Sequence, residues 1–287
     1  TSAFPARSTP RSRWRAPNVR SDAGAPGAPM RADVPLRVFL TGASSGLGEA
    51  LARHYARRGA TLGLVARRGE ELERVARSIA PATVATYAVD VRDAGAMIAA
   101  ARDFDAKHGV PDIVIANAGV SRGTLVEHAE DLEAFRAVFD TNVAGIVHTF
   151  HPFVGPMRAA GRGTLVGIAS VAGFRGIPGS AAYSASKAAA IRLLESLLVE
   201  LRAGGVRVVT VCPGYVATPM TARNPYRMPF LMDADRAAAS IARAIERGKR
   251  FHVLPWPMAL VGGLLRMLPR PVFDLAFAKA PRKPRQK

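Results

Sequence analysis

Short apolar runs alternate along the chain with longer segments whose apolar residues recur at helical spacing. The runs predict strands at residues 36–40, 61–66, 83–89, 113–116, 164–169, 206–211 and 251–254. The segments between them predict helices at 49–58, 70–79, 94–108, 132–157 and 181–203. Strands separated by helices form βαβ units, whose right-handed crossovers place helices on both faces of a parallel sheet. The pattern therefore predicts a single doubly wound α/β domain with a parallel sheet of about seven strands.

Proline-rich segments flank this domain. Six of the 21 prolines lie in residues 1–35 and six in residues 255–287. Residues 1–35 lack apolar periodicity, so we expect a disordered basic extension. Its few acidic residues fit a targeting segment, but an upstream extension with translation from Met30 is favoured. The folded domain is then 36–254, followed by an apolar and then basic segment, 255–287.

Composition limits the partners of the domain. The 287 residues are 49% hydrophobic and carry a formal net charge of +18, which is enough apolar material for a core. The charge lies mainly at the ends: residues 1–35 carry six Arg against two Asp, and residues 247–287 carry ten Lys and Arg against one Asp. Only +5 remains for residues 36–246. No basic-aromatic platform accompanies the charge, so nucleic-acid binding is not favoured.

Neither metal ligands nor a membrane span are indicated. The single cysteine, Cys212, has no partner for a disulfide and reads as inert core. His148 and His151 are three apart but lack a third ligand, so packing is favoured over metal binding. The longest stretch without Asp, Glu, Lys or Arg is 141–157, 17 residues with two His and two Pro, whereas a spanning helix needs about 20 apolar residues.

A glycine-rich loop follows the first predicted strand directly. Residues 41–48 read TGASSGLG and lead into a helix. Glycines at a helix start let backbone N–H groups and the helix dipole meet a pyrophosphate without an obstructing Cβ. A tight strand-to-helix turn is the alternative. The dinucleotide interpretation assigns cofactor contacts to Gly42, Ser44, Ser45, Gly46, Leu47 and Gly48.

Two arginines stand where the second strand ends, at Arg67 and Arg68. An acid in this region binds the ribose 2′-hydroxyl of NAD, whereas guanidinium groups accommodate the 2′-phosphate of NADP. We therefore expect NADP(H) as the cofactor. The alternative is that both arginines are solvated charges at the start of the next helix.

Tyr183 and Lys187 are four residues apart in a predicted helix, so they project from one face. Ser170 directly follows a predicted strand. A tyrosine is a poor base at its reference pKa of about 10, but a nearby ammonium stabilises the phenolate and lowers that pKa. Taken alone, such a pair is usually a surface pair.

Residues 36–254 resemble the short-chain dehydrogenase/reductase family. The loop 41–48 is similar to the family's TGxxxGxG, and Tyr183 to Lys187 to its YxxxK. Further matches in order along the chain are Asp90, Val91, Asn117, Ala118, Gly119, Asn142, Ser170, Pro213, Gly214, Val216 and Thr218. The resemblance implies a Rossmann-type fold and hydride transfer between a nicotinamide and a carbonyl or secondary alcohol.

The resemblance also implies residue roles. Tyr183 would give a proton to the carbonyl oxygen or take it from the alcohol, and Ser170 would hydrogen-bond the same oxygen. Lys187 would lower the pKa of Tyr183 and hold the nicotinamide ribose. Asn142 would hold a water that relays protons from Lys187; on spacing alone, it equally fits an amide that supports a helix bend.

The remaining segments bear on substrate and partners. A lid at 215–235 contains Met220, Met228 and Met232 and suits a hydrophobic small molecule, although packing of the lid against the core explains it as well. The segment 255–287 fits docking on the fold or on a partner subunit, with contact to a membrane surface as the alternative. The helix 181–203 has apolar residues for both the core and a homo-oligomer contact.

These observations predict a cytoplasmic NADP(H)-dependent short-chain dehydrogenase/reductase, a carbonyl reductase or alcohol dehydrogenase. The alternative is a nucleotide-binding regulatory protein of the same fold without turnover.

Overall fold

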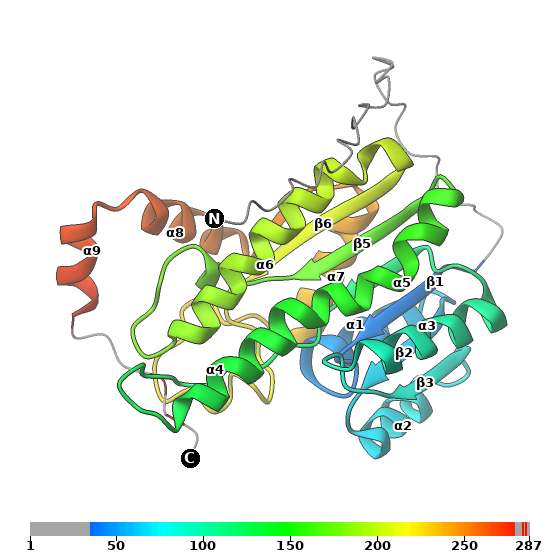
Figure 1. Cartoon of the computed structure of the whole chain (residues 1–287), viewed down its shortest axis with the longest axis horizontal. Coiled ribbons are helices and arrows are strands. Elements are labelled where there is room, and N and C mark those ends of the chain that lie inside the picture. Colours follow the sequence, from blue (N-terminus) through cyan, green and yellow to red (C-terminus); the bar gives the residue numbers. More distant parts are fainter. Residues whose placement is uncertain (1–34, 279–282, 284, 286–287) are drawn as a thin grey trace, which may run out of the picture.

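A seven-stranded parallel sheet forms the centre of the molecule, in the order β3-β2-β1-β4-β5-β6-β7 (Figure 1). The computed structural model describes residues 35–278, 283 and 285. The strands are β1 (Arg37–Thr41), β2 (Thr61–Ala66), β3 (Val84–Ala88), β4 (Ile113–Ala116), β5 (Gly163–Ile168), β6 (Val206–Pro213) and β7 (Phe251–Leu254). The predicted doubly wound α/β fold is confirmed. The expected disordered extension, 1–35, lies outside the described residues except for Pro35.

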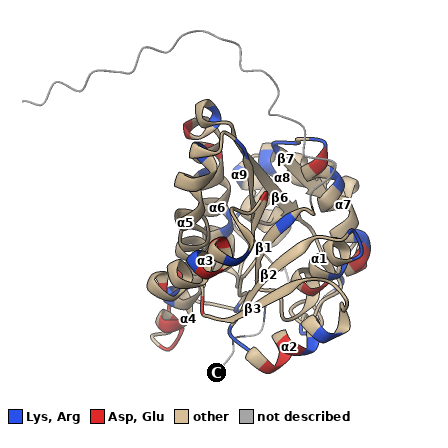
Figure 2. Cartoon of the chain, turned by 90° about the vertical axis from the view of Figure 1, so that its right-hand side faces the viewer, with Lys and Arg blue, Asp and Glu red and all other residues tan. Residues whose placement is uncertain are grey.

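Helices cover both faces of the sheet (Figure 2). One face carries α1 (Gly46–Ala56), α2 (Gly69–Ser78) and α7 (Ala234–Glu246); the other carries α3 (Ala94–His108), α4 (Asp131–Phe139), α5 (Gly145–Ala159) and α6 (Ala181–Glu200). Side chains alternate across the strands, so Val38 and Leu40 enter one core and Phe39 the other. Burial on both faces explains why the central strands read as unbroken apolar runs.

The helix predicted at 132–157 is confirmed, but it contains a π-turn. α4 ends at Phe139, a π-helical turn (η1, Asp140–Ala144) follows directly, and α5 begins at Gly145 without a break in the helical backbone. π-turns insert an extra residue into a helix and often occur at functional sites. The sequence analysis did not predict this turn, which contains Asn142 and is fixed by hydrogen bonds between Asn142 and Val120, 22 residues away along the chain.

Two short helices, α8 (Trp256–Met267) and α9 (Arg270–Phe277), form an arm at the edge of the fold (Figure 1). α8 lies against β7 and the short turn η2 (Val171–Gly173). A Cβ on Gly262 would come within 2.4 Å of the Phe174 ring, so glycine permits this close approach. No helix in the described ranges is long and apolar enough to cross a membrane.

Candidate active site

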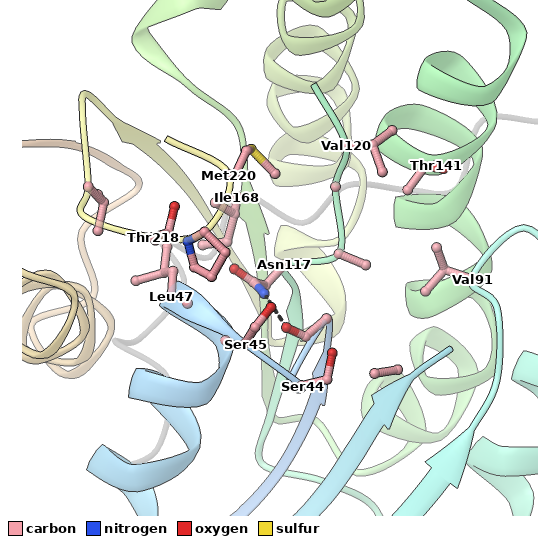
Figure 3. Close-up of a pocket in the computed structure, with 18 of the residues that line it drawn as sticks. Ser44, Ser45, Leu47, Val91, Asn117, Val120, Thr141, Ile168, Thr218 and Met220 are labelled. Atoms are coloured by element: carbon pink, nitrogen blue, oxygen red, sulfur yellow. Dashed lines mark hydrogen bonds between the residues drawn. The ribbon is translucent and has the colours of Figure 1, made fainter. Parts of the chain in front are cut away.

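The candidate site lies at the carboxyl ends of the central strands, where ligands bind in open α/β sheets. A cavity of about 320 Å³ opens there between the loop after β1 and the start of α6 (Figure 3). All of the predicted cofactor-binding residues line this cavity: Gly42, Ser44, Ser45, Gly46, Leu47, Gly48, Arg67, Arg68, Asp90, Val91, Asn117, Ala118, Gly119, Tyr183, Lys187, Pro213, Gly214, Val216 and Thr218. Ser170 lines it too, whereas Asn142 does not.

The glycines of the loop after β1 are required by its shape. Gly42 and Gly46 have φ values of +68° and +60°, which glycine adopts without strain. A Cβ on Gly48 would lie 2.1 Å from the carbonyl oxygen of Gly42. The first turn of α1 thereby keeps its free N–H groups close to the cavity, an arrangement that fits a pyrophosphate group.

Thr41 and Asn117 connect this loop to the end of β4. The Thr41 hydroxyl oxygen accepts hydrogen bonds from the N–H groups of Asn117 and Ala118, both at 3.2 Å. The Asn117 side chain donates to the carbonyl oxygens of Thr41 at 3.0 Å and Gly42 at 3.2 Å. Figure 3 shows Asn117 next to the loop in the cavity wall. These partly buried hydrogen bonds therefore fix the loop against the end of β4.

Charged side chains gather in the cavity wall beside the glycine-rich loop. Arg68 donates to the hydroxyl oxygens of Ser44 at 3.2 Å and Ser45 at 3.1 Å. Asp90 is bound by Arg92 at 2.7 Å and lies 3.9 Å from Arg67. Partial burial opposes ionisation of Asp90, but the hydrogen bonds from Arg92 outweigh it and hold its pKa below the ordinary value.

Ser170, Tyr183 and Lys187 come together in the wall of the same cavity. Ser170 caps η2, accepting from the Ala172 N–H at 3.1 Å. Lys187 is buried, and its Nζ donates to the Ile168 carbonyl oxygen at 2.7 Å and lies 5.8 Å from the centre of the Tyr183 ring. An ammonium has three N–H donors. The bond to Ile168 uses one of them, so two remain that could donate to ribose hydroxyls.

Burial dominates the protonation of this pair. Desolvation raises the pKa of Tyr183, and a hydrogen bond with Ser170 opposes the rise only in part. Desolvation also lowers the pKa of Lys187 to about 8. The sequence predicts a lowered pKa for Tyr183 from Lys187 alone. In the structure the pKa of Tyr183 is raised instead. The spacing of two residues carries no information about how deeply the helix is buried, so the sequence could not show this effect.

Asn142 lies in the π-turn behind the cavity. Its Oδ1 accepts from the Val120 N–H at 2.8 Å, while Nδ2 donates to the Val120 carbonyl oxygen at 2.9 Å and to the Ser186 hydroxyl at 3.0 Å. This geometry supports the reading of Asn142 as an amide that stabilises a helix bend. The proton relay through water stays a prediction.

A second, mostly apolar cavity of about 590 Å³ adjoins the first. Ser170, Tyr183, Gly214, Met220 and Thr221 line both. Its outer walls come from the segment after β6 and from α8 and α9, including Tyr215, Tyr226, Pro229, Met258, Val261, Gly262, Leu265, Phe273 and Phe277. The predicted lid thus contributes to this wall, although its Phe230 and Leu231 are 52% and 48% exposed.

Several lining residues were missed by the sequence analysis. In the first cavity these include Val120, Thr141 and Ile168, which are ordinary apolar or helical residues in the sequence. In the second, Arg175 and Lys283 were missed. Thr41 lines neither cavity but was also missed as a supporting residue, and its place at the start of the glycine motif is a usable signal.

His148 and Cys212 have ordinary structural environments. His148 Nδ1 lies 2.8 Å from the Val91 carbonyl oxygen. Cys212 is a buried free thiol whose pKa is raised by burial to about 12. Within the described part of the chain, no group of three or more His, Cys, Asp and Glu side chains is placed to hold a metal ion.

Comparison with known proteins agrees with this site. A family model described as short chain dehydrogenase matches residues 37–227. The chain belongs to the short-chain dehydrogenase family. It is therefore an oxidoreductase of a family that uses a nicotinamide cofactor and small-molecule substrates.

Individual relatives cover most of the chain. An uncharacterised oxidoreductase of Myxococcus xanthus is 42% identical over 240 residues, spanning 83% of this chain and 94% of the relative. The cis-4-hydroxycyclohexanecarboxylate dehydrogenase of Sinomonas cyclohexanicum is 34% identical, spanning 79% and 92%. A short-chain dehydrogenase from Burkholderia cenocepacia, solved in complex with NADP, is 26% identical with a TM-score of 0.74, spanning 86% and 98%.

Proposed function

We propose that the protein is an NADP(H)-dependent reductase or dehydrogenase that interconverts a carbonyl and a secondary alcohol on a hydrophobic small molecule. The observation that carries this proposal is the shared wall of the two cavities. Ser170 and Tyr183 line both the cavity behind the glycine loop and the mostly apolar cavity under α8. A substrate oxygen in the apolar cavity thereby meets the two hydroxyls next to the nucleotide site.

Each of the catalytic side chains has a role in this proposal. A bound nicotinamide gives or accepts the hydride. Tyr183 gives its phenolic proton to the carbonyl oxygen in reduction, and its raised pKa keeps that proton in place at neutral pH. Ser170 donates a hydrogen bond to the same oxygen. Lys187 holds the ribose and stabilises the phenolate, and Asn142 positions the backbone of Val120 beside them.

The charge near Ser44 supports NADP(H) over NAD(H). Arg68 reaches the rim of the loop, and Arg67 lies beside it at the end of β2. The one acid among the lining residues, Asp90, is already engaged by Arg92. A 2′-phosphate therefore meets two guanidinium groups and no free carboxylate. The Burkholderia cenocepacia structure, with its NADP, agrees with this preference.

The catalytic unit in this proposal is 36–254, with 215–235 as the substrate lid. The apolar wall from α8 and α9 adds to it and favours hydrophobic substrates. The relative named cis-4-hydroxycyclohexanecarboxylate dehydrogenase supports a secondary alcohol as the reduced form of the substrate.

A screen with NADPH and a panel of aliphatic, cyclic and aromatic ketones tests the proposal by absorbance at 340 nm. We expect NADPH oxidation with hydrophobic ketones and slower oxidation of NADH. Tight NADPH binding without turnover of any ketone, or of the matching alcohols with NADP⁺, would favour the alternative of a regulatory nucleotide-binding protein.

We also propose that the protein is a homo-oligomer. α6 buries Leu194 fully but leaves Val199 74% exposed, and Ile191 and Leu198 are only partly covered. Sedimentation velocity is expected to show a species larger than the 30.4 kDa chain. A monomer at micromolar concentration would contradict it.

The outer face of α8 needs a separate test. It exposes Trp256, Leu260, Leu264 and Met267, each at 66% or more. A partner subunit could bury these exposed apolar side chains of α8. A membrane surface is the second candidate, favoured by nearby basic residues. Co-sedimentation with anionic vesicles at low salt distinguishes them, since only the membrane contact predicts binding. The cytoplasmic location stays a prediction.

A further inference from the structure

The chain returns to the substrate cavity near its C-terminal end. Arg285 forms a backbone bridge with Gly123 and donates through Nε to the Asp131 carboxylate at 2.9 Å. A second nitrogen of Arg285 lies 3.4 Å from Glu130. Asp131 is buried at the start of α4 and also accepts from the Leu125 N–H at 2.8 Å. The hydrogen bond from Arg285 holds the pKa of Asp131 below its ordinary value, so this clasp is charged at neutral pH.

The clasp places Lys283 in the cavity wall. Lys283 is half-buried, lines the apolar cavity, and donates through Nζ to the Ser121 hydroxyl at 2.7 Å. Ser121 directly follows Val120, which lines the nucleotide cavity. The ammonium is therefore bonded to the residue that directly follows a wall residue of the first cavity. Burial lowers the pKa of Lys283 below its usual range.

The charged side chains that line this cavity are all positive. Its described lining contains Arg175, Arg227 and Lys283 and no Asp or Glu. Arg175 lies 4.6 Å over the Phe273 ring. None of the salt bridges among residues 35–278, 283 and 285 includes any of these three cations. A partly desolvated ammonium without a counter-charge is costly, and an anionic ligand group removes that cost.

We propose that the substrate is an apolar molecule carrying a carboxylate, and that Lys283, held in place by the Arg285–Asp131 clasp, recognises this carboxylate. The proposal rests on the proposed function, because it identifies the second cavity as the substrate site. The apolar walls from α8 and α9 take the hydrocarbon part, while Ser121 completes the polar end. A volume of about 590 Å³ is that of a drug-sized ligand site. Lys283 is thus a specificity-determining residue outside the catalytic group.

Binding of cis-parinaric acid and its methyl ester, measured by fluorescence titration without any cofactor, tests the proposal on the full chain. The two probes differ only in the charged group. A charge-assisted hydrogen bond corresponds to a roughly 10- to 100-fold lower Kd for the acid. We expect this ratio in the unmodified protein, and a ratio near one in Lys283→Met with the Kd of the ester unchanged. Lys249→Met, an exposed lysine outside the cavity, is the matched control and should keep the ratio.

The clasp is tested with Arg285→Met. This variant should lower the acid-to-ester preference, and it should have no further effect when combined with Lys283→Met, because Arg285 acts only by positioning Lys283. An unchanged preference in Lys283→Met, an equal loss for both probes, or no binding of either probe would overturn the proposal. Titration without cofactor keeps this result separate from the proposed function, which the 340 nm screen tests independently.

Discussion

Asn142 and Val120 are joined by a closed pair of hydrogen bonds, with Asn142 Oδ1 accepting from the Val120 N–H at 2.8 Å and Nδ2 donating to its carbonyl oxygen at 2.9 Å. The Asn142 amide pairs with the backbone N–H and C=O of Val120 in the way that the backbone of a neighbouring strand would. The segment leaving β4 is thereby fixed where Val120 lines the first cavity and Ser121 the second. The π-turn in the α4–α5 region is the backbone adjustment that makes this pairing possible.

Replacing Asn142 by alanine removes both bonds and leaves two partly buried backbone groups of Val120 without these partners. We expect a total loss of about 1 to 3 kcal/mol in the free energy of unfolding, measured by urea denaturation. Asn224→Ala is the control, since its recorded bond is a long one of 3.6 Å to the Met228 sulfur. Equal stability of the Asn142 variant and the unmodified protein would contradict this structural role.

Replacing Tyr183 by phenylalanine removes the proposed proton donor without changing the ring. Turnover should fall roughly 100- to 10,000-fold, while the Kd for NADPH changes little. Tyr55→Phe is the control, because the buried Tyr55 hydroxyl has no hydrogen-bond partner among the described residues. It should retain full activity. Normal turnover in Tyr183→Phe would remove the proposed mechanism.

Arg68→Ala tests cofactor discrimination. Loss of one charge-assisted contact, worth about 1.5 to 3 kcal/mol, should raise the Kd for NADPH roughly 10- to 100-fold and leave that for NADH nearly unchanged. Isothermal titration with both cofactors measures this. Arg77→Ala, an exposed arginine in the last turn of α2, should change neither affinity. A parallel loss for both cofactors would mean that Arg68 only supports the loop.

Gly48→Ala tests the loop geometry. The new Cβ would lie 2.1 Å from the Gly42 carbonyl oxygen, a backbone atom that cannot turn away. We expect cofactor binding to be lost in equilibrium titrations. Gly263→Ala, in α8 with open space around its Cβ, should instead stabilise the protein by roughly 0.5 to 1 kcal/mol. Unaltered NADPH affinity in Gly48→Ala would refute the phosphate-binding role.

Asp112 makes stability depend on pH. Half-burial opposes its ionisation, but hydrogen bonds from Arg37 and Arg162 outweigh this and lower its pKa in the folded state. Its contribution is therefore complete above the ordinary Asp pKa and is lost as pH falls through the lowered one. Asp112→Asn should cost about 1 to 3 kcal/mol at pH 7, with the difference disappearing in acid.

Urea denaturation from pH 7 to pH 2 measures this dependence. The control is Asp274→Asn, because Asp274 is exposed on α9. A pH-independent difference between Asp112→Asn and the unmodified protein would show that the Asp112 carboxylate charge is not what stabilises the fold.

The sequence predicts the sheet well, because buried parallel strands leave an unbroken apolar signature such as 61–66, which the structure reproduces as β2. The residues that it assigns to the cofactor all line the first cavity, since they follow strand ends within local motifs. The π-turn at Asn142 was not predictable, because Asn142 is bonded there to a segment that is distant along the chain. Lys283 was hidden for a similar reason: a basic tail gives no sign in its sequence that it returns to a cavity.

The approach of Gly262 to Phe174 joins two parts of the molecule mechanically. α8 forms a wall of the substrate cavity, and Phe174 ends the turn that begins at Ser170. Any side chain larger than hydrogen at position 262 would have to displace either the Phe174 ring or α8, and with α8 a wall of this cavity.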